Sequence, residues 1–174
     1  AVSALGFDAY NTAYAAIEAA LNANAAATSL DVATALWAVS LDNAVTGSIK
    51  FDQTGDAIKD SAYIKKAASA ESFEFVKTQS VENSATQGTA VDYSAVKASN
   101  PVVVNDTVYV GVYEHQSGDN GAGGKQEILG IQYANSVKNT VTAGGKEYKV
   151  ELVIVDNESS DAKAVSAASE LVNK

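Results

Sequence analysis

Two strongly apolar stretches in the second half of the chain constrain its fold more than any other feature. TVYVGVYE (Thr107–Glu114) is rich in Val and Tyr, and YKVELVIVD (Tyr148–Asp156) is almost continuously apolar. Such runs are typical of buried strands in a parallel sheet. A Gly-rich loop, Ser117–Gly124, and a helical pattern over about Lys125–Val137 separate them. The order predicts a βαβ unit with a right-handed crossover.

A last helix is expected after the second of these strands. Ser159 or Ser160 suits its N-cap, because a side-chain hydroxyl accepts a hydrogen bond from a free N–H group of the first turn. Its inward face is predicted to carry Ala164, Val165, Ala168 and Leu171. The pair Gly144-Gly145 is interpreted as a turn before the second strand.

The first half is predicted to begin with two helices. Apolar residues recur there at steps of three and four, which indicates one buried helical stripe formed by Phe7, Tyr10, Tyr14, Ile17 and Leu21. A second helix is expected from about Leu30 to Val39, with Ser29 as its N-cap. Strand-like stretches follow at Ser48–Phe51, Ala62–Ile64 and Phe73–Val76.

The composition changes over residues 80–100. Small and polar residues dominate this stretch, and the single proline, Pro101, closes it. A segment with so little to bury is typical of a linker. We therefore predict three parts: residues 1–79, a linker over residues 80–100 that forms an exposed tether, and residues 101–174. The two flanking parts are compatible with one compact lobe.

The charge and the cysteine content exclude several classes of function. The chain carries 12 basic residues, all of them lysine, against 21 acidic ones, for a net charge of -9. Nucleic-acid binding needs a basic face and favours arginine, so no nucleic-acid partner is expected. The absence of cysteine excludes disulfides and thiolate metal sites. No apolar run is long enough to cross a bilayer, and any signal peptide is expected to have been removed.

Several segments resemble the type I solute-binding proteins, the branched-chain amino-acid-binding family. VYVGVYEHQSGDNGAGGKQEILGIQYA (Val108–Ala134) and GGKEYKVELVIVDNESSDAKAVSAASELV (Gly144–Val172) resemble the N-terminal part of the first lobe. ALGFDAYNTAYAAIEAAL (Ala4–Leu21) and VTGSIKFDQTGDA (Val45–Ala57) are similar to the C-terminal portion of the family. The family's C-terminal segment thus precedes its N-terminal one. A junction between tandem binding domains, a circular permutant and a fragmentary or artificial chain all explain this order.

The resemblance implies a fold and a function. The implied fold is an α/β lobe of three layers with a mostly parallel sheet, periplasmic-binding-protein-like and flavodoxin-like, in rearranged order. The implied function is capture of a small amino acid, branched-chain or otherwise aliphatic, for an ABC permease in the membrane. It implies an extracytoplasmic location, periplasmic or on a cell-surface lipoprotein. Much of the family's second lobe is missing, so the chain is expected to carry a half-site with weak affinity.

The Gly-rich loop is the main candidate for the ligand site. Ligands of open α/β sheets sit beyond the carboxyl ends of the strands, where the N–H groups of a helix N-terminus attract anions. Five residues occupy this place: Gln116, Ser117, Gly118, Gly121 and Gly123. The resemblance adds Ser3 and Phe7, near the start of the first helix, as residues that border the cleft. The competing interpretation is a loop that only connects two elements, and core packing for Phe7.

Other chemistries fit less well. Asp119 stands where a phosphate-binding loop needs glycine, and the loop lacks a complete dinucleotide fingerprint, although Asp156 occupies the place of a ribose-binding acid. His115 and Ser117 are too close in one loop for nucleophile–base geometry. The acidic clusters match no calcium loop. We therefore predict no enzymatic activity, no cofactor and no metal site. The alternative function is a structural or interaction module that has lost its ligand. Self-association through an unpaired sheet edge is also expected.

Overall fold

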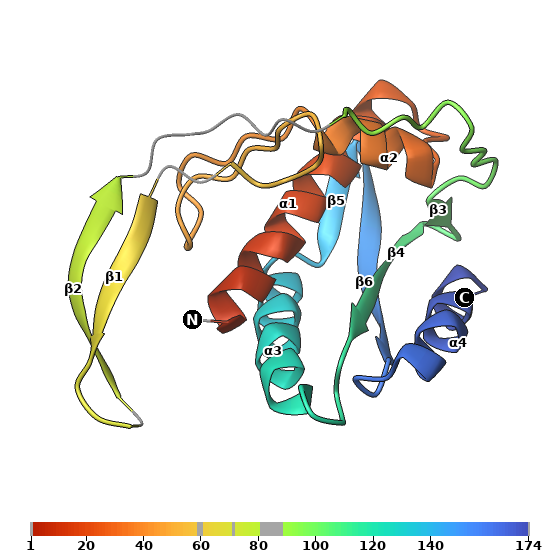
Figure 1. Cartoon of the computed structure of the whole chain (residues 1–174). Helices are drawn as coiled ribbons and strands as arrows, with labels where there is room; N and C mark the ends of the chain where they lie inside the picture. Colours follow the sequence, from red (N-terminus) through yellow and green to blue (C-terminus); the bar gives the residue numbers. More distant parts are fainter. Residues whose placement is uncertain (1, 59–60, 71, 81–88, 174) are drawn as a thin grey trace.

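Four helices and six strands occur in the part of the chain that the computed structural model describes, residues 2–58, 61–70, 72–80 and 89–173 (Figure 1). The helices are α1 (Val2–Ala23), α2 (Ser29–Leu36), α3 (Gly121–Val137) and α4 (Asp161–Val172). The strands are β1 (Ser61–Ala67), β2 (Phe73–Ser80), β3 (Val103–Val104), β4 (Thr107–Glu114), β5 (Thr140–Ala143) and β6 (Lys146–Asp156). The chain is therefore mixed α/β, as the sequence predicts.

The main sheet has the strand order β3-β4-β6-β5. Its central pair, β4 and β6, is parallel from Thr107 opposite Lys149 to Glu114 opposite Asp156, which confirms the predicted βαβ unit. Both outer pairs are antiparallel. The sheet is therefore mixed, and the expected mostly parallel sheet is wrong. β5 and β6 form an antiparallel hairpin, and β3 pairs antiparallel with β4. The turn of this hairpin is Gly144-Gly145, and both glycines have positive φ (58° and 78°).

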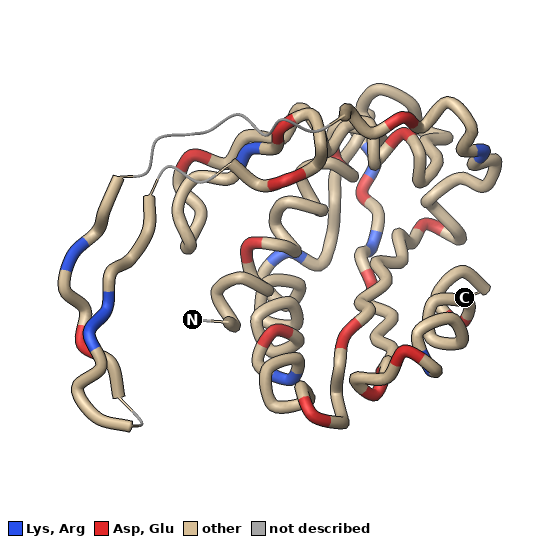
Figure 2. The backbone as a smooth tube through the Cα atoms, viewed as in Figure 1, with Lys and Arg blue, Asp and Glu red and all other residues tan. Residues whose placement is uncertain are grey.

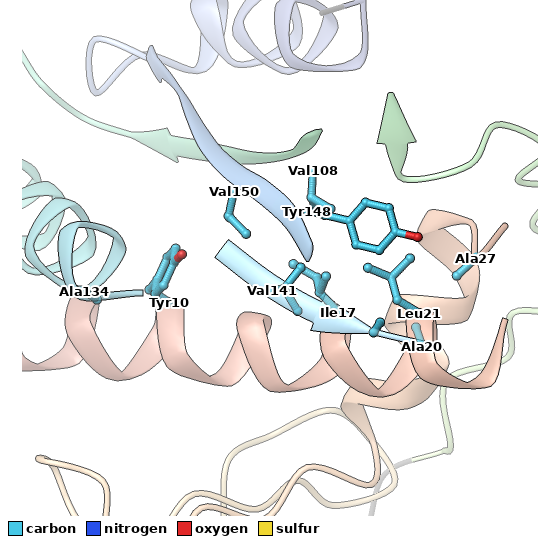
Figure 3. Packing of buried hydrophobic residues seen from close by; sticks show 11 residues of the cluster. Tyr10, Ile17, Ala20, Leu21, Ala27, Val108, Ala134, Val141, Tyr148 and Val150 are labelled. Carbon is cyan, nitrogen blue, oxygen red and sulfur yellow. The ribbon is translucent and has the colours of Figure 1, made fainter. Parts of the chain in front are cut away.

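Helices lie on both sides of this sheet (Figure 1). α1 and α3 lie side by side on one side, with α1 also against β5, and α4 lies on the other. The predicted stripe of α1 faces the core: Tyr10, Ile17 and Leu21 are buried, and Phe7 and Tyr14 pack against them. Their neighbours come from the second half of the chain and include Val108, Val141, Tyr148 and Val150 (Figure 3). One core thus joins the first two helices to the main sheet and α3.

The contact between α1 and α3 is made by backbone atoms at two glycines. A Cβ added at Gly6 would lie 2.2 Å from the carbonyl oxygen of Glu127, and one added at Gly130 would lie 1.8 Å from that of Ser3. No side chain fits at such separations. These two glycines therefore allow the helices to touch directly.

Segment 45–57 is tied to α1 by a buried carboxylate. Asp8 is 2% exposed and accepts hydrogen bonds from the backbone N–H groups of Val45 and Thr46 (3.0 and 2.7 Å) and from the Thr46 hydroxyl (2.7 Å). The predicted strand Ser48–Phe51 is wrong in this segment. Only isolated bridges form there, between Leu41 and Ile49 and between Phe51 and Ala57.

The structure also corrects the two short helices. Thr28, and not Ser29, caps α2, through a capping box in which Asp31 bonds back to the Thr28 backbone N–H (2.6 Å). Ser160 caps α4 by its backbone alone, since its side chain makes no cap hydrogen bond. The inward face of α4 consists of Ala164, Ala167 and Leu171, whereas the expected Val165 and Ala168 are exposed. Ala, Ser and Val residues occur on all sides of α4, so the sequence pattern does not show which side of the helix faces the sheet.

β1 and β2 form a separate antiparallel ribbon that stands away from the main sheet (Figure 1). Both strands are longer than expected, and nearly all their side chains are exposed. Of the predicted linker, residues 81–88 lie outside the described residues, and residues 89–100 form neither helix nor strand. Among the described helices, none has the length and apolarity that a membrane span requires.

Candidate functional site

The predicted loop lies at the carboxyl end of the parallel pair, beside a second loop from the same end of the sheet. Residues 115–120 connect β4 to α3, and residues 157–160 connect β6 to α4. Because β4 and β6 are adjacent and parallel, their outgoing loops meet at one edge. This is the position in which open α/β sheets hold their ligands.

Asp156, the last residue of β6, organises both loops. Its Oδ1 accepts hydrogen bonds from the backbone N–H groups of Gln116 (2.8 Å), Ser117 (3.3 Å) and Glu158 (2.8 Å). Its Oδ2 accepts the Ser117 hydroxyl at 2.7 Å. These bonds favour the charged carboxylate, the Ser117 hydroxyl most of all, and they lower the pKa of Asp156 to about 2. The carboxylate is thus a fixed negative charge at the centre of the candidate site.

Two further contacts join the loops. The Ser159 hydroxyl donates to the carbonyl oxygen of Ser117 (2.9 Å) and accepts the backbone N–H of Asn120 (3.1 Å). The imidazole Nδ1 of His115 lies 3.1 Å from Oδ1 of Asn157. His115 is therefore oriented by the second loop, and the Ser117 hydroxyl proton is directed to Asp156 and not to His115.

The predicted loop Ser117–Gly124 is shorter than expected, because α3 already begins at Gly121. Of the predicted glycines, only Gly118 is therefore in the loop, and the three have different roles. Gly118 has a φ of +75°, and a Cβ there would lie 2.3 Å from the carbonyl oxygen of Glu158, so only glycine fits. Gly121 is buried at the start of α3, and its N–H donates to the carbonyl oxygen of Gly118 (3.1 Å). Gly123 faces open space, because a Cβ built on it meets no atom within 4 Å. Of the predicted glycines, Gly123 leaves the most room for a ligand.

The N-terminus of α3 already has partners for several of its N–H groups. Gly123 and Gly124 both donate to the carbonyl oxygen of Asn120, at 3.0 and 3.2 Å. Together with the N–H of Gly121, three amide groups of the first turn are engaged within the loop. An anionic ligand would have to compete with these bonds, which reduces the attraction of this helix end.

Ser3 and Phe7 lie at a different place, on the part of α1 that contacts α3. The Ser3 hydroxyl donates to Oε1 of Gln126 (3.2 Å), and the Phe7 ring is 5.9 Å from that of Tyr133. A hollow of about 360 Å³ opens here, and its lining is almost entirely apolar: Ser3, Ala4, Phe7, Val45, Leu129, Gly130 and Tyr133. The predicted residues are therefore divided between a polar double loop and an apolar hollow.

A pair of acidic side chains next to the loop was not predicted. Glu114 ends β4, and its pKa is raised by partial burial, by a hydrogen bond with the Glu127 carboxyl group and by the charge of Glu127. The sequence distance between the strand end and the helix hides this pairing. Asn157 and Ser159 were also missed, although polar residues after a buried strand are a usual signal for this edge.

The remaining candidates belong to the structure of the core and the loops. Tyr10 is buried, and its hydroxyl donates to the carbonyl oxygen of Lys138, in agreement with the packing interpretation. Within the described ranges, no three His, Cys, Asp or Glu residues are grouped closely enough to hold a metal ion.

The chain matches no family model, and comparison with curated proteins and with solved structures gave no match either.

Proposed function

We propose that this chain is an amino-acid-binding lobe of the type I solute-binding class, with the double loop as its half-site. The finer fold belongs to this proposal: a three-layer lobe in which α1 and α3 cover one face of the sheet and α4 the other. Delivery to an ABC permease and an extracytoplasmic location are part of it as well. The support is the sequence resemblance together with the position of the ordered loops.

One observation carries the proposal: Asp156 fixes the loop after β4 at the carboxyl edge of the sheet. The charged carboxylate and the lone pairs of the Ser117 oxygen are acceptors, and they suit the ammonium group of an amino acid. The open space at Gly123 leaves room beside them. Because the site is open to water, each hydrogen bond contributes only about 0.5–1.5 kcal/mol. Two or three such bonds correspond to roughly millimolar affinity or weaker.

An NMR titration of the labelled chain with leucine, valine and polar amino acids tests this proposal. We expect shifts confined to residues 115–125, with saturation in the millimolar range. The variant Gly123→Leu places a large side chain in this open space, where an added Cβ meets no atom within 4 Å, so it should abolish the shifts. Ala168→Leu, on the exposed side of α4, is the control and should leave them unchanged.

Two outcomes would contradict the binding proposal. A panel without shifts would indicate the alternative function, a structural or interaction module that keeps the fold. The engaged N–H groups of Gly121, Gly123 and Gly124 favour this alternative, since they leave fewer donors for a carboxylate. Shifts that persist in Gly123→Leu would place the ligand outside the double loop.

A further inference from the structure

β4 has a free edge along most of its length. The carbonyl oxygens of Asp106 and Glu114 accept bonds from Lys149 and Asn157, at the two ends of the pairing with β6. Because backbone groups alternate in direction along a strand, the even-numbered residues face β6 and the odd-numbered ones face away. β3 pairs only with Thr107 and Val108. Among the described residues, the outward N–H and C=O groups of Tyr109, Gly111 and Tyr113 therefore have no strand beside them.

A groove runs along this edge. Its volume is about 190 Å³, and its lining consists of Ala9, Tyr10, Ala13, Val110, Gly111, Val112, Tyr113, Glu114 and Ile131. Five consecutive residues of β4 lie in this list, as expected for an open strand edge. Ala9 and Ala13 also line a larger apolar hollow of about 410 Å³ between α1, α2 and segment 45–57. A strand added to β4 would therefore lie beside apolar surface.

The β1–β2 ribbon has paired strands, but no other element covers its apolar side chains. Tyr63, Phe73, Phe75 and Val76 are 59%, 69%, 61% and 55% exposed. Soluble chains seldom leave so many large apolar side chains together in water without a partner. In Figure 1 the ribbon stands on the left of α1 and α3, with the sheet on their right. The ribbon thus lies on the opposite side of these helices from its own β4 edge.

Charge also favours contact between ribbon and edge. The two strands of the ribbon carry Lys65, Lys66 and Lys77 against Glu74, and Glu71 lies between them in the sequence, within a chain whose net charge is -9 (Figure 2). The β4 edge ends at Glu114, with the Glu127 carboxyl group beside it. A locally basic ribbon therefore meets an acidic strand end, and this attraction opposes the repulsion between two acidic copies.

We propose that two copies of this chain dimerise by adding the β1–β2 ribbon of each copy to the Tyr109–Tyr113 edge of the other. Backbone hydrogen bonds to the outward groups of β4 extend the main sheet, and the apolar ribbon side chains cover the groove beside α1. When the ribbon of each copy occupies the edge of the other, both surfaces of both copies are used, so this reciprocal exchange closes with two-fold symmetry. A one-way contact would instead propagate from copy to copy.

Light scattering of the 174-residue chain over a range of micromolar concentrations is the first test. We expect the mass to rise from monomer to dimer and no further. The ribbon variant Phe73→Lys with Val76→Lys keeps the ring contact between Tyr63 and Phe75. It and the edge variant Tyr113→Lys should each weaken the dimer by about tenfold or more, as for central apolar contacts of an interface.

Val165→Lys is the matched control, because Val165 is 76% exposed on α4 and belongs neither to the lining of the groove nor to the ribbon. This variant should leave the dissociation constant within about twofold, as for a residue outside an interface. A chain that stays monomeric at every concentration would overturn the proposal. A dimer that Val165→Lys weakens as much as the ribbon and edge variants would overturn it too.

Cross-linking identifies the contact even where a variant folds poorly. The chain has no cysteine, so single-cysteine variants at Val76 and at Tyr113 can be mixed and joined with a short bis-maleimide. We expect a cross-linked heterodimer from this pair and much less from Val76→Cys with Val165→Cys. A double variant that cross-links within one chain at high dilution would show that the ribbon closes on its own edge, which refutes exchange between copies.

Discussion

Single carboxylates hold distant segments together in this molecule. Asp8 fixes the segment around Thr46 to α1, and Asp156 joins the two loops at the carboxyl edge of the sheet. In both cases one side chain accepts several backbone and hydroxyl hydrogen bonds. Removal of such a group leaves all its donors without a partner at once, so its effect is larger than that of one ordinary hydrogen bond.

Asp8→Ala should destabilise the fold by about 3 kcal/mol, because three donors lose their acceptor in a buried site. Urea unfolding followed by circular dichroism measures the change. Asp42→Ala is the control: Asp42 forms an exposed ion pair with Lys50 (3.6 Å), and its loss should cost less than about 1 kcal/mol. Equal losses for the two variants would contradict the structural role of Asp8.

Ser117→Ala should raise the pKa of Asp156 from about 2 toward the ordinary value of an aspartate, because the Ser117 hydroxyl is the largest cause of the lowered value. NMR titration of the side-chain carboxyl carbon measures it. The depressed pKa means that the stabilisation by Asp156 is present above about pH 4 and is lost as the pH falls toward 2. Ser166→Ala, on α4, should leave this titration unchanged.

At the scale of elements, two glycines set the distance between α1 and α3. Gly130→Ala places a Cβ against the carbonyl oxygen of Ser3 and should cost about 2–4 kcal/mol, since the helices must separate. Gly123→Ala in the same helix meets open space, and the better helix propensity of alanine should stabilise the fold by up to about 1 kcal/mol. The melting temperatures of both variants, measured by thermal unfolding, test these opposite changes in stability. A similar loss in both would mean that the helix contact is not as close as described.

The sequence predicts the elements that have a clear hydrophobic period. The five-residue stripe of α1 and the apolar run of β4 were both located correctly, because each forms a face that must be buried. β5 was missed, since its four residues, Thr140–Ala143, are too few to show a period. The face of α4 was partly wrong, because Ala and Val residues occur around the whole helix and none of them dominates.

The candidate site was only partly predictable, for a different reason. The loop itself could be located, because it follows a recognisable strand and is rich in glycine. Its partners come from the loop after β6, about 40 residues further along the chain. No local pattern links Ser117 to Asp156 or Asn120 to Ser159. Pairing of that kind depends on the parallel register of β4 and β6, which becomes visible only in the folded chain.

At the scale of the whole molecule, the two halves of the sequence share one core. Tyr10 and Leu21 of the first half are buried with Val108 and Tyr148 of the second. Residues 80–100 connect the two halves along the chain, and residues 89–100 form neither helix nor strand. A break in this connection should therefore leave the folded structure together.

Limited trypsin digestion should cut first after Lys97, which is exposed in the irregular stretch. The two fragments should then co-elute under native conditions and separate only in denaturant, because the core spans both. Lys149, within β6, should be cut much later. Lys97→Gln removes the first cut and serves as the control. Early cleavage at Lys149, or fragments that separate without denaturant, would contradict the shared core.

The shared core has a consequence for the synthesis of this protein. The Tyr10 hydroxyl bonds to Lys138, 128 residues later, so α1 leaves the ribosome long before its partners exist. Because translation adds about 5–20 residues per second, the apolar stripe of α1 stays without its partners for roughly 10 seconds. During that time α1 is an uncovered amphipathic helix, open to chaperones and to neighbouring nascent chains. Slower translation of the second half should therefore increase aggregation, and binding of a chaperone to the first 25 residues should suppress it.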